Sequence, residues 1–136
     1  MNTVYPLFFG HLHTGHINLA SDTVTLYGVV TGGANYNFSS GHQYLNEISA
    51  GDIVSQVALT TSIDASGVFD ASDATFPSVS GANIGALVFA VNKESDSNSP
   101  LFMYMDIASG ESPVLLAPNG NNIDVSFSPN GIYSLI

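Results

Sequence analysis

Positive charge is nearly absent from this sequence. Its 136 residues include one lysine, Lys93, and no arginine, against eleven carboxylates, so the formal net charge is −10 at pH 7. Proteins that bind nucleic acid use rows of Lys and Arg to neutralise phosphates and release counterions. Attraction to anionic membrane surfaces depends on the same side chains. The composition therefore predicts no nucleic acid and no membrane among the partners of this protein.

Cysteine and tryptophan are also absent. Without thiols the chain has no disulfide, no thiolate nucleophile and no Cys-based metal site. No apolar run approaches the ~18 residues that a membrane-spanning helix needs. Residues 1–16 contain a short apolar patch but no basic region, which is not the pattern of a secretory signal peptide. We therefore expect a protein that is made soluble and is not exported by the usual route.

The residues that are abundant are those of a folded domain. Hydrophobic residues make up 45% of the chain and charged residues 9%, with eight Phe and six Tyr, which is the opposite of a disordered composition. The length fits one domain. With so few charges, the polar surface must consist mainly of Ser, Thr, Asn and Gly. Such a neutral surface suits a protein that packs against other subunits, while Lys93, beside Glu94 and Asp96, is expected to be a solvated loop cation.

The dominant hydrophobic period is two, which is typical of strands with one face toward a core. Residues 23–30, 56–63, 101–107 and 123–128 alternate in this way. The run 84–91 (IGALVFAV) is apolar at every position, which favours a central strand covered on both faces. Turn signals separate these segments, and short strands at even spacing are typical of sandwiches and barrels. The sequence therefore predicts an all-β fold: a single-domain antiparallel β-sandwich or barrel with a short N-terminal arm or helix.

The connections between the predicted strands are also marked. The polar loop 92–100 joins two strong strands and predicts a hairpin, and residues 119–122 and 129–131 are predicted to form tight turns. Residues 35–51 depart from the strand pattern, with one turn of helix expected near residues 43–48.

The N-terminal segment follows neither pattern fully. Apolar residues in residues 4–17 lie near helical spacing, but Pro6 and two glycines keep any helix short. We therefore divide the chain into an arm, residues 1–18, and a β-sandwich domain, residues 19–136. The arm carries three large apolar side chains without an evident core partner. These are the candidate partner-contact residues Phe8, Phe9 and Leu12.

Histidines gather in the same arm. His11, His13 and His16 lie within six residues, and His42 follows downstream. On a strand His11 and His13 would share a face, on a helix His13 and His16 would, and His42 or Asp22 could complete a metal site. The spacing matches no established zinc pattern, so surface or interface histidines are the favoured interpretation and no metal is predicted. A pH-sensitive contact is a milder variant.

Carboxylates concentrate in one loop, at Asp64, Asp70 and Asp73. Oxygen ligands of this kind bind calcium, but the alternating acids and closing Glu of the EF-hand are missing. The favoured interpretation is a solvated hairpin whose Asp side chains accept hydrogen bonds from turn backbone.

Signatures of catalysis are missing. The pair Gly32-Gly33 lacks the following Lys and the strand–helix context of a phosphate loop, and no G-x-S-x-G elbow marks a nucleophile. We therefore predict no enzymatic activity and no cofactor, and rank a small hydrolase last among the possible functions.

An ordered series of short motifs runs from Leu19 onward. In sequence order these are residues 19–26 (LASDTVTL), 44–51 (YLNEISAG), 59–81 (LTTSIDASGVFDASDATFPSVSG), 84–91, 101–110 (LFMYMDIASG) and 118–127 (PNGNNIDVSF). In this order they resemble small virion structural proteins of tailed bacteriophages, over about residues 17–136. The chain differs from that family in its near lack of Lys and Arg, and in a His-rich N-terminus where relatives carry a plain short helix.

The resemblance implies a non-enzymatic virion component. The leading hypothesis is a capsid decoration or cement protein on the outer surface of the phage head, in contact with the major capsid protein and with copies of itself in a trimer or dimer. An acidic module can complement a basic patch on a shell protein. A tail- or baseplate-associated protein is the alternative. A carbohydrate- or receptor-binding module using Tyr27, Tyr36 and Tyr44 is a hypothesis of another class.

Overall fold

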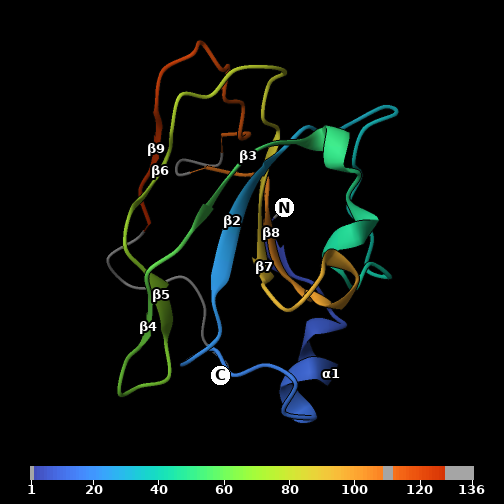
Figure 1. Ribbon diagram of the computed structural model, residues 1–136, viewed down its shortest axis with the longest axis vertical. Coiled ribbons are helices and arrows are strands. Elements are labelled where there is room, and N and C mark those ends of the chain that lie inside the picture. The colour runs from blue at the N-terminus through green and yellow to red at the C-terminus, as the bar shows by residue number, and fades with distance from the viewer. Residues whose placement is uncertain (1, 109–111, 128–136) are drawn as a thin grey trace.

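A computed structural model describes residues 2–108 and 112–127 of the chain (Figure 1). Most of its regular structure is β, which confirms the predicted all-β, single-domain class. In chain order the elements are β1 (Asn2–Val4), α1 (Phe8–His13), β2 (Val24–Val29), η1 (Leu45–Glu47), η2 (Ala50–Asp52), β3 (Ile53–Ala58), β4 (Thr61–Ile63), β5 (Phe69–Ala71), β6 (Ala74–Phe76), β7 (Ala86–Val91), η3 (Asp96–Asn98), β8 (Leu101–Met105) and β9 (Ile123–Val125).

The centre of the fold is a five-stranded antiparallel sheet. Its strand order is β1-β8-β7-β2-β3, and two small sheets, β4-β5 and β6-β9, lie beside it. β7 and β8 pair with each other across the 92–100 loop, which confirms the predicted hairpin. β2 lies between β7 and β3, so the strand that is second in the chain pairs with one more than fifty residues away.

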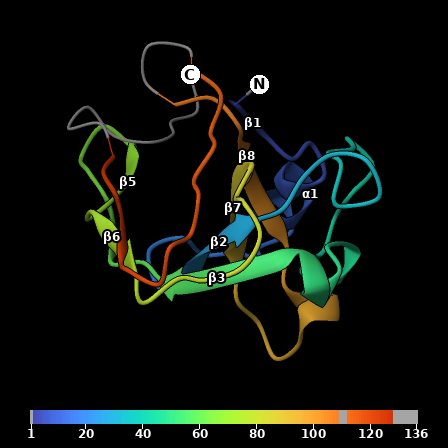
Figure 2. The same ribbon diagram turned by 90° about the horizontal axis from the view of Figure 1, so that it is seen from above.

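The central sheet is covered on both faces. Figure 2 shows β5, β6 and β9 on one side of it and the segment between β2 and β3 on the other. One core cluster contains Phe89 and Phe102, and a second contains Tyr27, Val88 and Tyr104. The predicted burial on both faces is confirmed for residues 86–91, since every residue of β7 is buried.

Burial of β2 exceeds the prediction. Its alternation suggested one exposed face, yet all six residues are buried. The polar groups on the second face find partners in the Asn92 side chain. The Thr25 hydroxyl donates to Asn92 Oδ1, and Asn92 Nδ2 donates to the Tyr27 hydroxyl at 3.1 Å. Buried polar atoms satisfied in this way carry little of the desolvation penalty that would otherwise keep them exposed.

Residues 56–63 form two strands, not the single strand predicted. β3 pairs with β2 as far as Ala58, and the chain then leaves the central sheet so that β4 pairs with β5. The period of two continues across the break, but β4 buries no residue fully, and its Ile63 is 43% exposed. At the other end, β9 confirms the strand predicted from residue 123, and Phe127 beyond it packs against the core.

The predicted short elements are largely confirmed. The N-terminal helix is α1, and the helical turn expected near residues 43–48 is the 3₁₀ turn η1, capped by the Glu47 carboxylate, which accepts from Tyr44 N at 2.9 Å. The turn at 119–122 contains Gly120 at φ 87°, a conformation that favours glycine. The predicted turn at 129–131 lies outside the described residues.

Residues 2–17 pack against the same core as the rest of the domain. β1 adds to the edge of the central sheet by pairing with β8, and Tyr5, Phe8 and Ile17 are almost fully buried. Side chains of the segment predicted as an arm therefore belong to both core clusters, and the division of the chain at residue 18 stays a prediction. In residues 2–108 and 112–127, no helix is long and apolar enough to cross a membrane.

Candidate functional site

The histidines do not converge as either predicted pairing requires. His11 lies on the buried face of α1, with its ring 5.1 Å from that of His16 and 5.3 Å from that of Tyr44. Its Nε2 accepts a hydrogen bond from the Gln43 amide at 2.9 Å. Burial, with a smaller contribution from His16, lowers the pKa of His11, so this ring is neutral at pH 7. Its role in the fold is to attach α1 to the segment before η1.

His42 belongs to a different cluster. Its Nδ1 is hydrogen-bonded to the Tyr36 hydroxyl at 2.8 Å, and Tyr36 is bonded to the Tyr5 hydroxyl at 2.8 Å. Burial raises the pKa of Tyr36 to about 12 and also raises that of Tyr5, so both remain protonated at neutral pH. Within the described ranges, no three His, Asp or Glu side chains lie close enough together to hold a metal ion.

The acidic loop is a hairpin, as the favoured interpretation predicted. It joins β4 to β5, and Asp64 Oδ1 accepts from Ser66 N at 2.8 Å and Val68 N at 3.0 Å. Asp70 Oδ1 accepts from Ala71 N, and Asp73 Oδ1 accepts from the backbone of Phe127 at 3.0 Å. These carboxylates therefore satisfy backbone donors and are not directed at a common point.

The tyrosines considered for sugar binding do not form an open platform. Tyr27 and Tyr36 are 3% and 5% exposed, and both belong to the second core cluster. Tyr44 is half-buried beside His11. A carbohydrate needs an accessible aromatic face to stack on, and two of these three rings do not offer one.

The candidate partner-contact residues have partners within the chain. Phe8 is 1% exposed and stacks on Phe102 with ring centroids 4.3 Å apart, while Leu12 packs against the same core cluster. Phe9 is half-buried and meets Phe8 edge-on. The premise that these side chains lack a core partner is therefore wrong, and contact with another protein through Phe9 or Leu12 stays a prediction.

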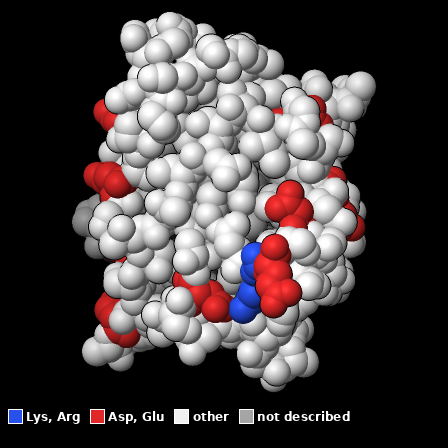
Figure 3. Space-filling view, viewed as in Figure 1, with Lys and Arg blue, Asp and Glu red and all other residues white. Residues whose placement is uncertain are grey.

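The lone cation is paired. Lys93 Nζ lies 3.0 Å from Asp22 Oδ2, a residue from before β2, so the expectation of a purely solvated loop cation is wrong. Partial burial opposes ionisation of Asp22, but hydrogen bonds from Asn18 N and from Lys93 together lower its pKa. Figure 3 shows Lys93 in blue between carboxylates, below a broad uncharged face. The carboxylates on the rest of the described surface have no Lys or Arg counter-ion.

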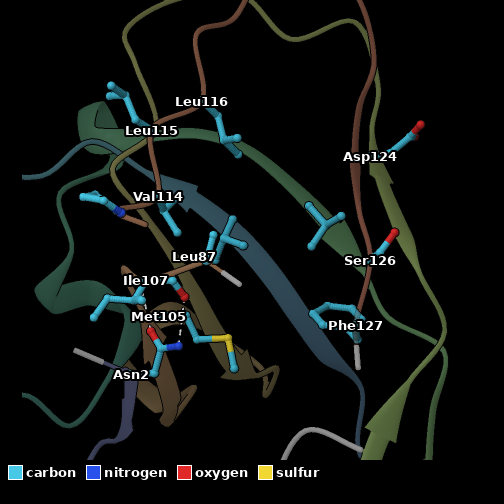
Figure 4. Close-up of a pocket in the computed structure, with 13 residues that line it drawn as sticks. Asn2, Leu87, Met105, Ile107, Val114, Leu115, Leu116, Asp124, Ser126 and Phe127 are labelled. Atoms are coloured by element: carbon cyan, nitrogen blue, oxygen red, sulfur yellow. Dashed lines mark hydrogen bonds between the residues drawn. The ribbon is translucent and has the colours of Figure 1, made fainter. Parts of the chain in front are cut away.

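An apolar groove of about 610 Å³, here called the inter-sheet groove, opens between the central sheet and β9. Its floor includes Leu87 of β7 and Met105 of β8, and its walls are residues 113–116 and 124–127. Figure 4 shows Val114 and Leu116 directed across the groove and Phe127 directed back toward them. Leu115, 69% exposed, points away from the groove at its rim.

The groove offers few polar groups. Asn2 closes one end, where its Oδ1 accepts from Asp106 N and Ile107 N and its Nδ2 donates to Ile107 O. The carboxylate on the wall, Asp124, accepts from the Thr75 hydroxyl at 2.7 Å. Such a mainly apolar lining is suited to apolar groups.

Sequence reasoning did not find this groove. Its two walls come from segments after β8 and around β9, and local periodicity does not show which strands will leave a gap between them. One signal was present: Val114-Leu115-Leu116 is an apolar run that no predicted strand includes.

A scan against protein-family models and a search of curated proteins both found no match to this chain.

Proposed function

We propose that this protein is a non-enzymatic structural component of a tailed-bacteriophage virion, a decoration or cement protein on the outer surface of the capsid. In that position it stabilises the shell through contacts with the major capsid protein and with copies of itself, as a trimer or dimer. The order of motifs from residue 19 to residue 127 supports the assignment to a virion.

Uncompensated negative charge is the observation that carries the proposed mode of docking. The net charge is −10, and the one lysine is already paired with Asp22. Six carboxylates are exposed on several elements: Glu47, Asp64, Asp73, Glu94, Asp96 and Asp124. Such a surface repels nucleic acid and anionic proteins, and it is attracted to basic patches over about a Debye length, roughly 8 Å at physiological salt. A basic patch on the outside of a shell is a complementary partner.

The residues considered for catalysis support the non-enzymatic part of the proposal. His11 bonds Gln43, His42 bonds Tyr36, and Asp64 accepts from turn backbone. Each of these groups has a structural partner, and none lines the inter-sheet groove. We therefore assign them to the stability of the domain.

Electron microscopy of virions tests the location. Particles that carry a labelled copy of this protein should show label over the head at symmetric sites, and particles without the protein should lose their contents at lower temperature. Label confined to the tail or baseplate would contradict the capsid location and support the alternative, a tail-associated structural protein. Unlabelled virions would contradict both versions.

Salt dependence tests the docking mode. Shells stripped of this protein should rebind it at about 0.05 M salt and release most of it at about 1 M, because a Debye length near 3 Å screens charge pairs at the rim of an interface. Sedimentation of the protein alone at both salt concentrations is the control. Binding that does not change with salt would contradict docking through carboxylates while leaving the location to the microscopy.

A further inference from the structure

One edge of the central sheet is open along β3. This strand pairs with β2, and no other described strand pairs with it. Leu59 N donates to Val24 O at 2.9 Å, so every second residue of this segment bonds to β2 and the residues between direct their N–H and C=O groups away from it. Gln56 and Ala58 are such residues, and both are exposed. Within residues 2–108 and 112–127, neither backbone N–H has a hydrogen-bond partner.

The β3 edge lacks the usual protection against pairing with another chain. Edge strands are commonly guarded by charged side chains or proline. β3 contains neither, and the uncharged run around it extends over residues 53–63. The register shift between Gly28 and Val29 lies beside the first residues of β3, so its second half stays regular. The opposite edge of the sheet, β1, is only three residues long.

The distribution of charge favours a second copy of this chain as the strand that pairs here. Figure 2 shows β3 at the outer side of the sheet, and Figure 3, viewed as in Figure 1, shows a broad uncharged surface over it with carboxylates around its margin. A basic partner is attracted to the carboxylates. Two copies with a net charge of −10 repel one another, and they do so least where neither presents a charge.

We propose that two copies pair in antiparallel fashion through their β3 edges, with Gln56 of each copy opposite Ala58 of the other and Val57 at the two-fold axis. Antiparallel pairing of identical strands is two-fold symmetric, so the same donors and acceptors serve both copies. Each opposed Gln56 and Ala58 exchange two backbone hydrogen bonds, and the two five-stranded sheets become continuous. The inference rests on the proposed function for the expectation that copies meet, but not for a place in a virion.

Charge substitutions at the edge test the pairing. Gln56→Glu places a carboxylate on each side of the two-fold axis and should raise the dissociation constant of the dimer at least about tenfold. Ser62→Glu adds the same charge at an exposed residue of β4, away from the edge, and should change that constant by less than about twofold. Sedimentation equilibrium measures both.

A second substitution tests the register. Gln56→Glu/Ala58→Lys sets unlike charges opposite each other at both ends of the paired segment and should restore the dimer. Gln56→Glu/Ser62→Lys has the same net charge but leaves the edge repulsive, so it should stay dissociated. Equal recovery in the two double variants would contradict the register.

Amide hydrogen exchange tests the backbone pairing directly. The Gln56 and Ala58 amides should exchange at least about tenfold more slowly at about 1 mM protein than at about 0.01 mM, because pairing protects them only in the dimer. The Leu59 amide, already bonded to Val24, should show no such change.

Three outcomes would overturn the proposal. The first is a monomer or a trimer at about 1 mM protein, since one edge accepts one partner strand. The second is a dimer in which Gln56 and Ala58 exchange as fast as in the monomer, which would locate the contact elsewhere. The third is equal weakening by Gln56→Glu and Ser62→Glu.

Salt separates this contact from docking on a shell. Raising salt from about 0.05 M to about 1 M screens the repulsion between two acidic copies and should strengthen the dimer, whereas docking on a basic patch should weaken. A dimer that weakens with salt would contradict pairing through the uncharged edge. Failure of either contact leaves the other to be judged by its own measurement.

Discussion

At the scale of single residues, the side chains that a sequence offers for chemistry are used here for packing. His11 is 8% exposed and keeps its hydrogen bond to Gln43 only while its Nε2 is unprotonated. His16 and Tyr44 are the other polar side chains in ring contact with it. A buried neutral histidine of this kind makes stability depend on pH.

Stability should fall as the pH drops through the range in which His11 titrates. Its folded-state pKa lies below the ordinary value of 6.5, so the unfolded chain binds more protons as the pH falls past that value. The contribution of His11 is complete above about pH 6.5 and is lost progressively below it. Urea unfolding at about pH 7 and about pH 5.5 should show a smaller loss in His11→Gln than in the natural protein.

The matched control for this prediction is on the same helix. His13 is exposed, and His13→Gln should keep the natural pH dependence. A His11→Gln protein that loses as much stability on acidification as the His13→Gln protein would assign the effect to other groups.

At the scale of elements, one carboxylate organises the β4–β5 hairpin. Asp64 accepts from two backbone N–H groups of the turn, and the positive φ of Gly67, 83°, lets the chain reverse between them. The hairpin packs Phe69 edge-on against Phe102. The turn therefore helps to position a side chain that covers the main core. The stability of the element and that of the core are therefore coupled.

Replacing Asp64 should destabilise the domain modestly. Asp64→Ala removes two charge-assisted hydrogen bonds in an exposed turn and should lower the free energy of unfolding by about 1–2 kcal/mol. Ser62→Ala, an exposed change in β4, should alter it by less than about 0.5 kcal/mol. Chemical denaturation measures both. A calcium-dependent rise in Tm that Asp64→Ala abolishes would instead support the calcium interpretation.

At the scale of the whole molecule, negative charge acts against compactness. The net charge of −10 is carried by a chain with one described Lys–Asp pair, so carboxylates repel one another more strongly in the folded state than in the expanded unfolded state. Salt screens that repulsion. The same charge opposes contact between copies through their charged surfaces.

Salt should therefore stabilise this protein. Raising sodium chloride from about 0.02 M to about 0.5 M shortens the Debye length to a few ångströms and should raise Tm by a few degrees. Lys93→Met, which removes the only Lys or Arg, should lower Tm at low salt by more than at high salt. A Tm that falls with added salt would show that attractive charge pairs dominate in the folded state.

The sequence by itself determined the features that depend on local pattern or on composition. Period-two alternation located β2, β3, β8 and β9, and the continuous apolar run located β7. Turn residues marked the 92–100 hairpin, and the Asp64 side chain indicated the turn that it stabilises. Each of these depends on residues that are neighbours in the chain. The formal net charge was also determined by the sequence, because it is the sum of the charged side chains and does not depend on the fold.

Only the tertiary structure decided which surfaces meet. Four features join residues that are far apart in the chain. They are the burial of β2 on both faces, the pairing of β4 with β5, the pair of Lys93 with Asp22, and the two walls of the inter-sheet groove. Alternation shows that a strand has an apolar face, but the free energy of burying that face is nearly the same against many partners. Packing of the whole chain selects one of them, and so decides which histidines pair and which apolar residues remain uncovered.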